Sequence, residues 1–252
     1  MNTMNNKSIS IITVYNKEYM LPEINQWIEK QSVFQQIETV QLDNCSNQFS
    51  SCAQALNYGA QHAQGQYLFF MHQDLYLWDL QAVENYVAYL TEHPDQIIGV
   101  AGVPCGSSTV TDIYESKTYL ERGTRANGKL MEVETLDECL IAMTKETWER
   151  LKFDEVACDN WHGYAVDICL SNTLQGHKNI LYPLQVCHDS TGNAHNADFR
   201  TTIKHLIQKY RGTAITRIHG TCIDIPCRWC SFYWYNFKEN VKGLLWRFGL
   251  LR

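Results

Sequence analysis

The stretch that most constrains the fold is a run of apolar residues that ends abruptly in a polar turn. Residues 67–71 (YLFFM) are all apolar or aromatic, and His72, Gln73 and Asp74 follow them directly. A short apolar run with polar boundaries is typical of a strand covered on both faces of a parallel sheet. Ligands of such sheets bind beyond the carboxyl ends of the strands, so Asp74 is a candidate ligand for a hard divalent cation. The alternative is a loop acid that only caps the helix expected from Asp79.

Strand-like runs and amphipathic segments alternate through the first part of the chain. The expected strands are 8–14, 34–42, 67–71 and 96–103, and the expected helices are 17–30, 51–62 and 79–90. This alternation predicts an α/β fold with a doubly wound, mostly parallel sheet. From Pro104 to Lys129 the pattern dissolves, which predicts either a mobile loop over the site or an ordinary surface excursion. Two short strands are expected within 131–143, and a short helix at 145–151.

Length and charge limit the classes of function. At 252 residues we expect one domain, placed at 1–199, followed by a basic helical extension at 200–252. The net charge of −6 argues against general nucleic-acid binding. Met1 to Ser10 is polar, so we expect no signal peptide, and no apolar run is long enough for a transmembrane span. Ten cysteines without an export signal are typical of reduced thiols in a cytosol.

Two blocks of sequence carry a family resemblance. They comprise Asn57-Tyr58-Gly59-Ala60, Ala63-Gln64-Gly65 and His72-Gln73-Asp74, then Phe153-Asp154-Glu155, residues 161–170, Gly176 and the turn at 186–192. Their order resembles the family 2 glycosyltransferases of the GT-A fold, whose Asn-x-Gly helix leads into a strand and a metal-binding Asp-x-Asp. The branch it resembles is that of the streptomycin-biosynthesis glycosyltransferase-like proteins. The resemblance implies a nucleotide-sugar half at about 8–103 and an acceptor half at about 129–192. This sequence departs from the family pattern at His72, because the first acid of Asp-x-Asp is missing.

The resemblance implies a donor site at the carboxyl ends of the first strands. The residues that would contact a uridine or thymidine diphosphate sugar are Tyr15, Asn16, Asp43, Asn57, His72 and Gln73. The alternative for Tyr15 and Asn16 is a simple turn. Asp74 and His188 would hold Mn²⁺ or Mg²⁺, because an oxygen and an imidazole ligand suit these ions and the cation neutralises a leaving diphosphate. The alternative for His188 is an ordinary loop histidine.

The acceptor half must supply a base that takes the proton of the attacking hydroxyl. The acidic pair that family 2 commonly uses falls on Tyr164-Ala165, and neither residue is a base. Asp167 is therefore the first candidate, with Asp159 and His162 in reserve. The alternative is that Asp167 orients the helix or binds acceptor hydroxyls. Two aromatic residues would stack on an acceptor sugar or pack in the core, namely Trp161 and Tyr164.

The activity implied by the resemblance is transfer of a hexosyl-type sugar, with inversion, to a glycan or lipid-linked acceptor in surface polysaccharide or glycoconjugate synthesis. A nucleotidyltransferase is one alternative, but residues 15–17 (YNK) do not form the Gly-rich phosphate loop that it would need. A degenerate sugar- or nucleotide-binding relative is another, because of the missing first acid and Ala165. The resemblance implies a cytoplasmic location, and it leaves open whether the protein is a homo-oligomer.

A possible zinc cluster lies near the C-terminal end. His219, Cys222, Cys227 and Cys230 have spacings within the range of structural zinc sites. All four lie within twelve residues, and no second pair is present to brace them. The alternative is a set of reduced thiols beside an amphipathic segment.

The last segment, 228–252, has an amphipathic pattern. Its apolar stripe consists of Trp234, Phe237, Val241, Leu244, Phe248 and Leu251. Residues 200–252 hold ten Lys or Arg and two acids, whereas residues 1–199 hold eleven and twenty-five. A basic helix with an aromatic face lies naturally in a membrane interface, so we expect peripheral contact with the inner face of the cell membrane. The alternative is that the helix docks on its own domain or on a second subunit.

Overall fold

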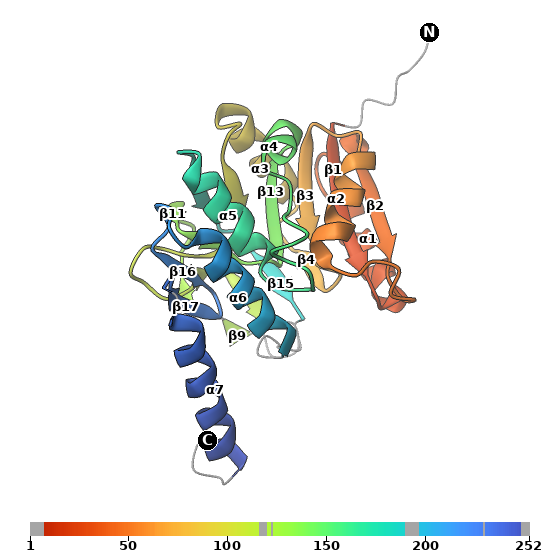
Figure 1. The fold of residues 1–252 in the computed structure, drawn as a ribbon. Coiled ribbons are helices and arrows are strands. Elements are labelled where there is room, and N and C mark those ends of the chain that lie inside the picture. The colour runs from red at the N-terminus through yellow and green to blue at the C-terminus, as the bar shows by residue number, and fades with distance from the viewer. Residues whose placement is uncertain (1–7, 116–119, 122, 190–196, 229, 248–252) are drawn as a thin grey trace.

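A computed structural model of the chain describes residues 8–115, 120–121, 123–189, 197–228 and 230–247 (Figure 1). The side chains of residues 120, 121, 239 and 242–247 are also outside the description. Among the expected features, the end of the 186–192 turn and the stripe residues Phe248 and Leu251 lie outside the described residues, as does the side chain of Leu244.

The centre of the molecule is a seven-stranded sheet. Its strands in chain order are β1 (Ile9–Tyr15), β2 (Ile37–Asp43), β3 (Tyr67–Met71), β5 (Ile97–Gly99), β11 (Met131–Val133), β13 (Leu140–Thr144) and β14 (Asn179–Leu181). Their spatial order is β11-β14-β5-β13-β3-β1-β2. Strands β1, β2, β3, β5 and β14 run in one direction, and β13 and β11 run against them. The expected mostly parallel sheet is confirmed.

Helices cover both faces of this sheet. They are α1 (Leu21–Glu29), α2 (Cys52–His62), α3 (Ala82–Glu92), α4 (Lys145–Leu151), α5 (Tyr164–Leu174) and α6 (Ala197–Tyr210), with short 3₁₀ turns at Glu18–Met20 and Phe34–Gln36. Because side chains alternate along a strand, Leu68 and Phe70 of β3 pack under α2, α4, α5 and α6. Tyr67, Phe69 and Met71 pack on the opposite face with α1 and α3. The apolar run at 67–71 is therefore a strand buried on both sides, as predicted.

Two helix caps follow from the sequence. The Ser51 side chain accepts a hydrogen bond from Gln54 N at the start of α2, and Thr144 accepts one from Thr147 N at the start of α4. The helix expected from Asp79 begins three residues later, at Ala82, and the Asp79 carboxylate accepts the N–H of Gln81 in the turn before it.

Short strands replace the loop expected at 104–129. Among the described residues, β6 (Ala101–Val103), β7 (Val110–Thr111), β10 (Thr124–Arg125) and β12 (Thr135–Leu136) form one small sheet. A second small sheet contains β4 (Leu75–Leu77), β8 (Ile113–Glu115), β9 (Leu120–Glu121) and β15 (Val186–His188). The strand expected at 96–103 is likewise divided, because β5 and β6 pair in different sheets on either side of a bend at Val100. The segment expected to hold two strands at 131–143 contains β11, β12 and most of β13.

The basic part of the chain is only partly a separate extension. The expected boundary at residue 200 falls inside α6, whose Phe199, Ile203 and Leu206 are buried in the core with α5. The chain continues into a hairpin of β16 (Arg217–Gly220) and β17 (Ile223–Pro226) and then into α7 (Ser231–Arg247), which extends away from the sheet (Figure 1). Within the described residues, no helix has the length and apolar character needed to cross a membrane.

Candidate functional site

The turn after β3 lies at the edge where three parallel strands end. β1 pairs with both β2 and β3, and in this register Tyr15 lies beside Asp43. His72, Gln73 and Asp74 leave β3 at the same edge, because the carboxyl ends of parallel strands coincide. Gln73, after β3, joins this turn to the end of β1, because its side-chain oxygen accepts the N–H groups of Asn16 and Lys17 at 3.0 Å each.

A strand from the far end of the domain brings His188 to this turn. β15 pairs antiparallel with β4, which places His188 beside Leu75, and the N–H of Asp189 donates to the carbonyl of Asp74 at 2.9 Å. As a result, Nε2 of His188 lies 3.2 Å from Oδ1 of Asp74, and Nδ1 of His72 lies 3.9 Å from the same oxygen. In the part of the chain that the structure describes, these three residues are the one group of potential metal ligands whose atoms converge, within 4.8 Å of one another.

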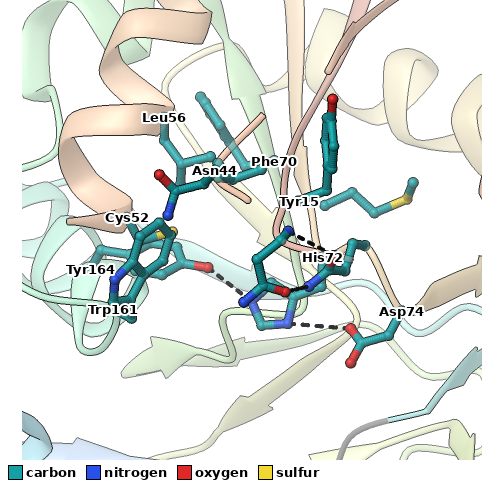
Figure 2. Close-up of a pocket in the computed structure, with 13 residues that line it drawn as sticks. Tyr15, Asn44, Cys52, Leu56, Phe70, His72, Asp74, Trp161 and Tyr164 are labelled. Carbon is teal, nitrogen blue, oxygen red and sulfur yellow. Dashed lines mark hydrogen bonds and ion pairs between the residues drawn. The ribbon is translucent and has the colours of Figure 1, made fainter. Parts of the chain in front are cut away.

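Tyr164 orients the ring of His72. The Tyr164 hydroxyl donates to the carbonyl of Glu138 at 3.2 Å, so its oxygen accepts the Nε2–H of His72 at 3.0 Å (Figure 2). Nδ1 of His72 then keeps its lone pair toward Asp74. Burial, together with the neighbouring charge of His188, lowers the pKa of His72 to about 4, which keeps the ring neutral near pH 7. A neutral imidazole is the form that binds a metal.

The donor set fits a divalent cation. Two imidazole nitrogens and one carboxylate oxygen lie within 4.8 Å of one another. Burial acts to raise the pKa of Asp74, but the hydrogen bond from His188 and the charge of the His188 ring hold this pKa below its ordinary value. Asp74 is thus ionised near pH 7. His72 belongs with these ligands by position, whereas the sequence motif led us to expect it among the nucleotide contacts.

A first cavity of about 190 Å³ adjoins the cluster on the side of β1 (Figure 2). Its walls carry Tyr15, Asn16 and the buried Asn44 from the ends of β1 and β2, with His72 and Asp74 at one end. The remaining lining includes Gln73, Cys52, Leu56, Phe70, Trp161 and Tyr164. Asp43 is exposed beside Tyr15 and lies outside this lining, where its carboxylate accepts the N–H of Cys45 at 2.7 Å. Asn44 is a polar wall residue that the sequence motif did not single out.

A second cavity of about 530 Å³ lies on the other side of the cluster. Its walls include His72 and His188, so it begins at the candidate ligands. Trp161, which is 38% exposed, lines both cavities and separates them together with His72. The position of Trp161 suits the predicted sugar contact, which stays a prediction.

Two acids in the wall of the second cavity were not predicted as site residues. They are Asp137 and Glu138, in the turn between β12 and β13. Burial and the charge of Asp137 raise the pKa of Glu138 to about 8, despite hydrogen bonds from the N–H groups of Gly163 and Tyr164. Burial also acts to raise the pKa of Asp137, but the charge of His188 and hydrogen bonds from Thr221 and Cys139 hold it low. The only sequence signal was an acidic pair that interrupts an apolar run.

Asp167 is not placed to act as the base. Its side chain is 1% exposed, and Nζ of Lys209 lies 2.8 Å from both carboxylate oxygens. The hydroxyl of Tyr210 also donates to Asp167 at 2.8 Å. Both carboxylate oxygens of Asp167 therefore face the interior between α5 and α6, away from both cavities. The predicted role is therefore corrected to a structural one, since a base must reach the acceptor hydroxyl.

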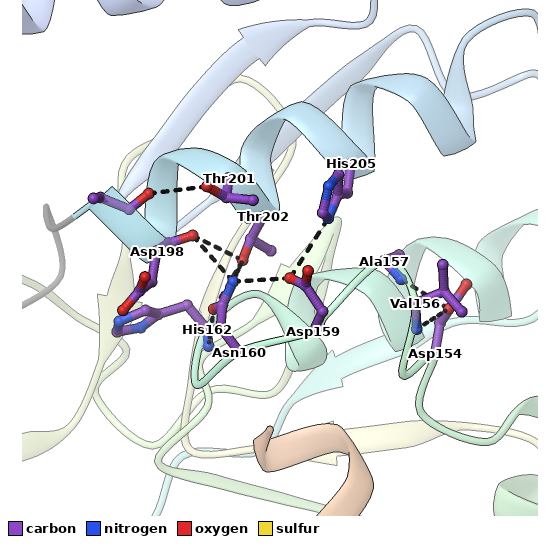
Figure 3. A network of polar contacts seen from close by, with 11 residues as sticks. Asp154, Val156, Ala157, Asp159, Asn160, His162, Asp198, Thr201, Thr202 and His205 are labelled. Carbon is purple, nitrogen blue, oxygen red and sulfur yellow. Dashed lines mark hydrogen bonds and ion pairs between the residues drawn. The ribbon is translucent and has the colours of Figure 1, made fainter. Parts of the chain in front are cut away.

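The two reserve bases lie in different surroundings on the loop before α5 (Figure 3). Asp159 is directed at α6, where Oδ1 lies 3.5 Å from Nδ1 of His205, and it lines neither cavity. His162 lines the second cavity, and burial lowers its pKa, which makes the ring a weaker base. Asn160 fixes this loop by donating to Oγ1 of Thr202 at 2.7 Å.

Two further predicted contacts are corrected. Asn57 uses its side chain to join α2 to the segment after α4: its amide nitrogen donates to Phe153 O, and its oxygen accepts from Phe153 N and Trp148 Nε1. It lines neither cavity, so it is not placed to contact a nucleotide. Tyr164 is 2% exposed and holds His72, which leaves its ring no free face for an acceptor sugar.

The four candidate zinc ligands near the C-terminal end do not converge among the described residues. Nδ1 of His219 lies 2.6 Å from Glu134, and the β16–β17 hairpin pairs His219 with Asp224 instead of a cysteine. Cys222 and Cys230 are exposed free thiols, and Cys227 is half-buried. The interpretation as reduced thiols stays a prediction.

The fold and the site together define an α/β protein with a candidate divalent-cation site at the carboxyl edge of its sheet. A family profile described as "Glycosyltransferase like family" matches residues 10–210. The chain therefore belongs to this glycosyltransferase family. No curated protein sequence matches it.

Solved structures share the fold at low sequence identity. A mannosyltransferase from Pyrobaculum calidifontis, in complex with GDP-Man and Mn²⁺, has a TM-score of 0.55 at 16% identity, over 81% of this chain and 63% of that one. S. aureus TarS 1–349 with UDP-GlcNAc has a TM-score of 0.52 at 16% identity, over 82% and 67%. GalNAc-T7 with UDP, GalNAc and Mn²⁺ has a TM-score of 0.51 at 12% identity, over 81% and 48%. These likenesses confirm the GT-A fold, and the chain spans about half to two thirds of these proteins.

Proposed function

We propose that the protein transfers a sugar from a nucleoside diphosphate sugar and depends on a divalent cation. The observation that carries this proposal is the convergence of His72, Asp74 and His188 at the carboxyl edge of the sheet, between two cavities. The first cavity would take the nucleotide, with Tyr15 beside its base and Asn16 and Asn44 as polar partners. We expect a uridine or thymidine diphosphate donor, and solved structures of similar fold hold UDP, UDP-GlcNAc or GDP-Man.

His72, Asp74 and His188 would hold Mn²⁺ or Mg²⁺. A cation at this point would neutralise the charge that develops on the leaving diphosphate. Mn²⁺ accompanies the nucleotide in two of the solved structures of similar fold. The protein's own contribution is to fix the ligands: Tyr164 orients His72, and the β4–β15 pairing holds Asp74 against His188.

We propose Glu138 as the base, in place of Asp167. It lines the second cavity, and its raised pKa suits proton transfer near neutral pH. In the transfer step an oxygen lone pair of the acceptor hydroxyl forms a bond to the anomeric carbon. The bond from that carbon to the diphosphate oxygen breaks, its electron pair leaves with the diphosphate, and the hydroxyl proton passes to the Glu138 carboxylate. Attack from the side of the second cavity, opposite the leaving group, inverts the anomeric centre.

The finer assignments extend this proposal. We propose a hexosyl-type sugar, a glycan or lipid-linked acceptor in surface polysaccharide or glycoconjugate synthesis, and the streptomycin-biosynthesis-like branch. Trp161 would contact the acceptor sugar from the wall of the second cavity. We also propose a cytoplasmic enzyme with peripheral membrane contact through residues 228–252, and the oligomeric state is open to measurement.

Calorimetry with a nucleotide tests the proposal directly. UDP should bind with measurable heat when Mn²⁺ is present and at least tenfold more weakly when EDTA replaces it. A panel of UDP-, dTDP- and GDP-sugars should then include one donor from which the protein releases the free nucleotide in a metal-dependent way. Equal affinity with and without Mn²⁺, and no release from any donor, would contradict a metal-dependent transferase.

A further inference from the structure

Helix α7 has one attached face and one uncovered face. Phe232 and Tyr235 pack against the core on the attached side, and the helix extends from the domain beside β17 (Figure 1). On the other side, four large apolar side chains at helical spacing are 40–64% exposed, namely Tyr233, Trp234, Phe237 and Val241. The Trp234 and Phe237 rings stack with centroids 5.7 Å apart. An uncovered aromatic face of this size on one helix indicates a surface that binds a partner.

Positively charged residues line a cavity beside this face. This tail cavity, of about 1050 Å³, lies between the β16–β17 hairpin and α7 and contains Arg217, Arg228 and Lys238. Arg217 forms an ion pair with Asp224, so Arg228 and Lys238 supply the excess charge. Nζ of Lys238 lies 5.5 Å from the centre of the Trp234 ring, so cation and aromatic surface are presented together. Such a combination suits a partner with anionic groups above an apolar layer.

The tail cavity is also a neighbour of the second cavity. Cys222, at the turn of the hairpin, lines both of them, and Ile223 and Thr221 continue the wall of the second cavity. A partner on the tail cavity would therefore lie next to the place where the acceptor is expected. This adjacency links the surface to the chemistry of the proposed reaction.

We propose that the tail cavity and the exposed face of α7 bind the anionic headgroups of a lipid bilayer, and that this contact presents a lipid-linked acceptor to the second cavity. The part that concerns the acceptor rests on the proposed function. Tryptophan and tyrosine rings favour the headgroup level of a bilayer, and Lys and Arg are attracted to anionic lipid. A second copy of the chain is the competing occupant, but the excess of positive charge on this face would oppose its pairing with itself.

Thiol footprinting of the unaltered protein tests the placement. Vesicles of phosphatidylcholine with about one third phosphatidylglycerol should slow alkylation of Cys222 and Cys230, which border the tail cavity. Cys45, an exposed thiol after β2, should react at the same rate with and without vesicles and serves as the internal control. Vesicles of phosphatidylcholine alone should protect none of the three. Protection of Cys45 to the same degree, or protection of none by the anionic vesicles, would overturn the proposal.

Vesicle pelleting with matched variants tests the surface itself. Trp234→Ser and Lys238→Glu should each lower the pelleted fraction at least fivefold. Val156→Ser, at an apolar residue that is 82% exposed elsewhere, and Lys129→Glu, at an exposed turn, should pellet like the wild type. All four should bind UDP with Mn²⁺ as the wild type does, which separates this proposal from the proposed function. Equal pelleting of all variants would overturn the proposal that this surface binds a bilayer. A wild-type protein that does not bind vesicles but forms a dimer, which Trp234→Ser dissociates, would also overturn it.

Discussion

Oδ1 of Asp74 lies 3.2 Å from Nε2 of His188, and the pairing of β4 with β15 holds the two residues in place. Because this carboxylate is the only acid in the cluster, its loss should remove metal binding without unfolding the domain. Asp74→Asn keeps the volume and one oxygen, and we expect it to abolish the Mn²⁺-dependent part of UDP binding in calorimetry. Asp95→Asn changes an exposed acid outside the cluster, so it is the matched control and should bind normally. Undiminished metal-dependent affinity in Asp74→Asn would rule out this ligand.

Tyr164→Phe tests whether the tyrosine orients His72. Its hydroxyl accepts from His72 at 3.0 Å and lies outside the ligand set, so the variant keeps all three ligands. Loss of a group that orients a metal ligand typically costs 10–100-fold in metal affinity, and we expect about tenfold here. The measurement is titration with Mn²⁺ followed by its electron paramagnetic resonance signal. A variant that binds Mn²⁺ normally but has lost acceptor transfer would instead support the sugar contact inferred from the sequence.

The sheet, and the edge of it where the candidate metal ligands lie, were largely predictable from the sequence. The strand at 67–71 is buried on both faces, and a polar turn after such a strand lies at the edge where ligands bind. The caps at Ser51 and Thr144 were predictable because they are local, each satisfying an N–H three residues ahead. The short strands at 104–129 were not, because two- and three-residue strands have no periodic signal and are defined by their pairing with other strands, among them β15, which pairs with β8 from more than 70 residues later in the chain.

The proposed base Glu138 and the surroundings of Asp167 and Asn57 were not predictable, because access to a cavity is a tertiary property. In the sequence, Asp167 lies just after Tyr164-Ala165, where family 2 commonly has its acidic pair. In the fold, however, α6 from later in the chain covers Asp167 and supplies Lys209. Asn57 belongs to a recognisable motif but is engaged by the segment around Phe153. Glu138 carried no motif, and only folding brings its carboxylate to the N–H of Gly163 and to the cavity wall.

Glu138→Gln should separate binding from chemistry. The amide keeps the shape of the side chain but cannot take a proton, so transfer should fall by on the order of 10²-fold or more. UDP affinity in the presence of Mn²⁺ should stay within twofold of the wild type, because Glu138 lies outside the first cavity. Release of the free nucleotide from the donor found in the nucleotide-sugar screen is the assay, with water as acceptor if no glycan is known. Wild-type turnover in Glu138→Gln would exclude it as the base.

The pH profile of the wild type gives a second test of Glu138. Burial and the charge of Asp137 raise its pKa to about 8, so at pH 6 most molecules carry the neutral acid. Turnover should therefore rise by close to tenfold per pH unit between about pH 6 and 7 and level off above about pH 8. In Glu138→Gln this ascending limb should be absent from the residual activity. A profile that is flat over this range in the wild type would contradict the assignment.

Lys209→Met tests the structural role of the acid that we first expected to be the base. Nζ of Lys209 lies 2.8 Å from Asp167 and from Oδ2 of Asp154, so its removal leaves a buried carboxylate without its cation. Breaking such a pair costs about 3–5 kcal/mol, and we expect the lower end because Asp154 and Lys209 are partly exposed to solvent. Unfolding in urea should show a lowered midpoint at an unchanged slope.

Adding Asp167→Asn to Lys209→Met should recover part of the lost stability, because the amide keeps the hydrogen bond from Tyr210 without leaving a buried charge. Lys204→Met, at an exposed position of the same helix, should change the free energy of unfolding by no more than about 0.5 kcal/mol. If Asp167→Asn alone were fully stable but lost transfer, Asp167 would act in the chemistry after all.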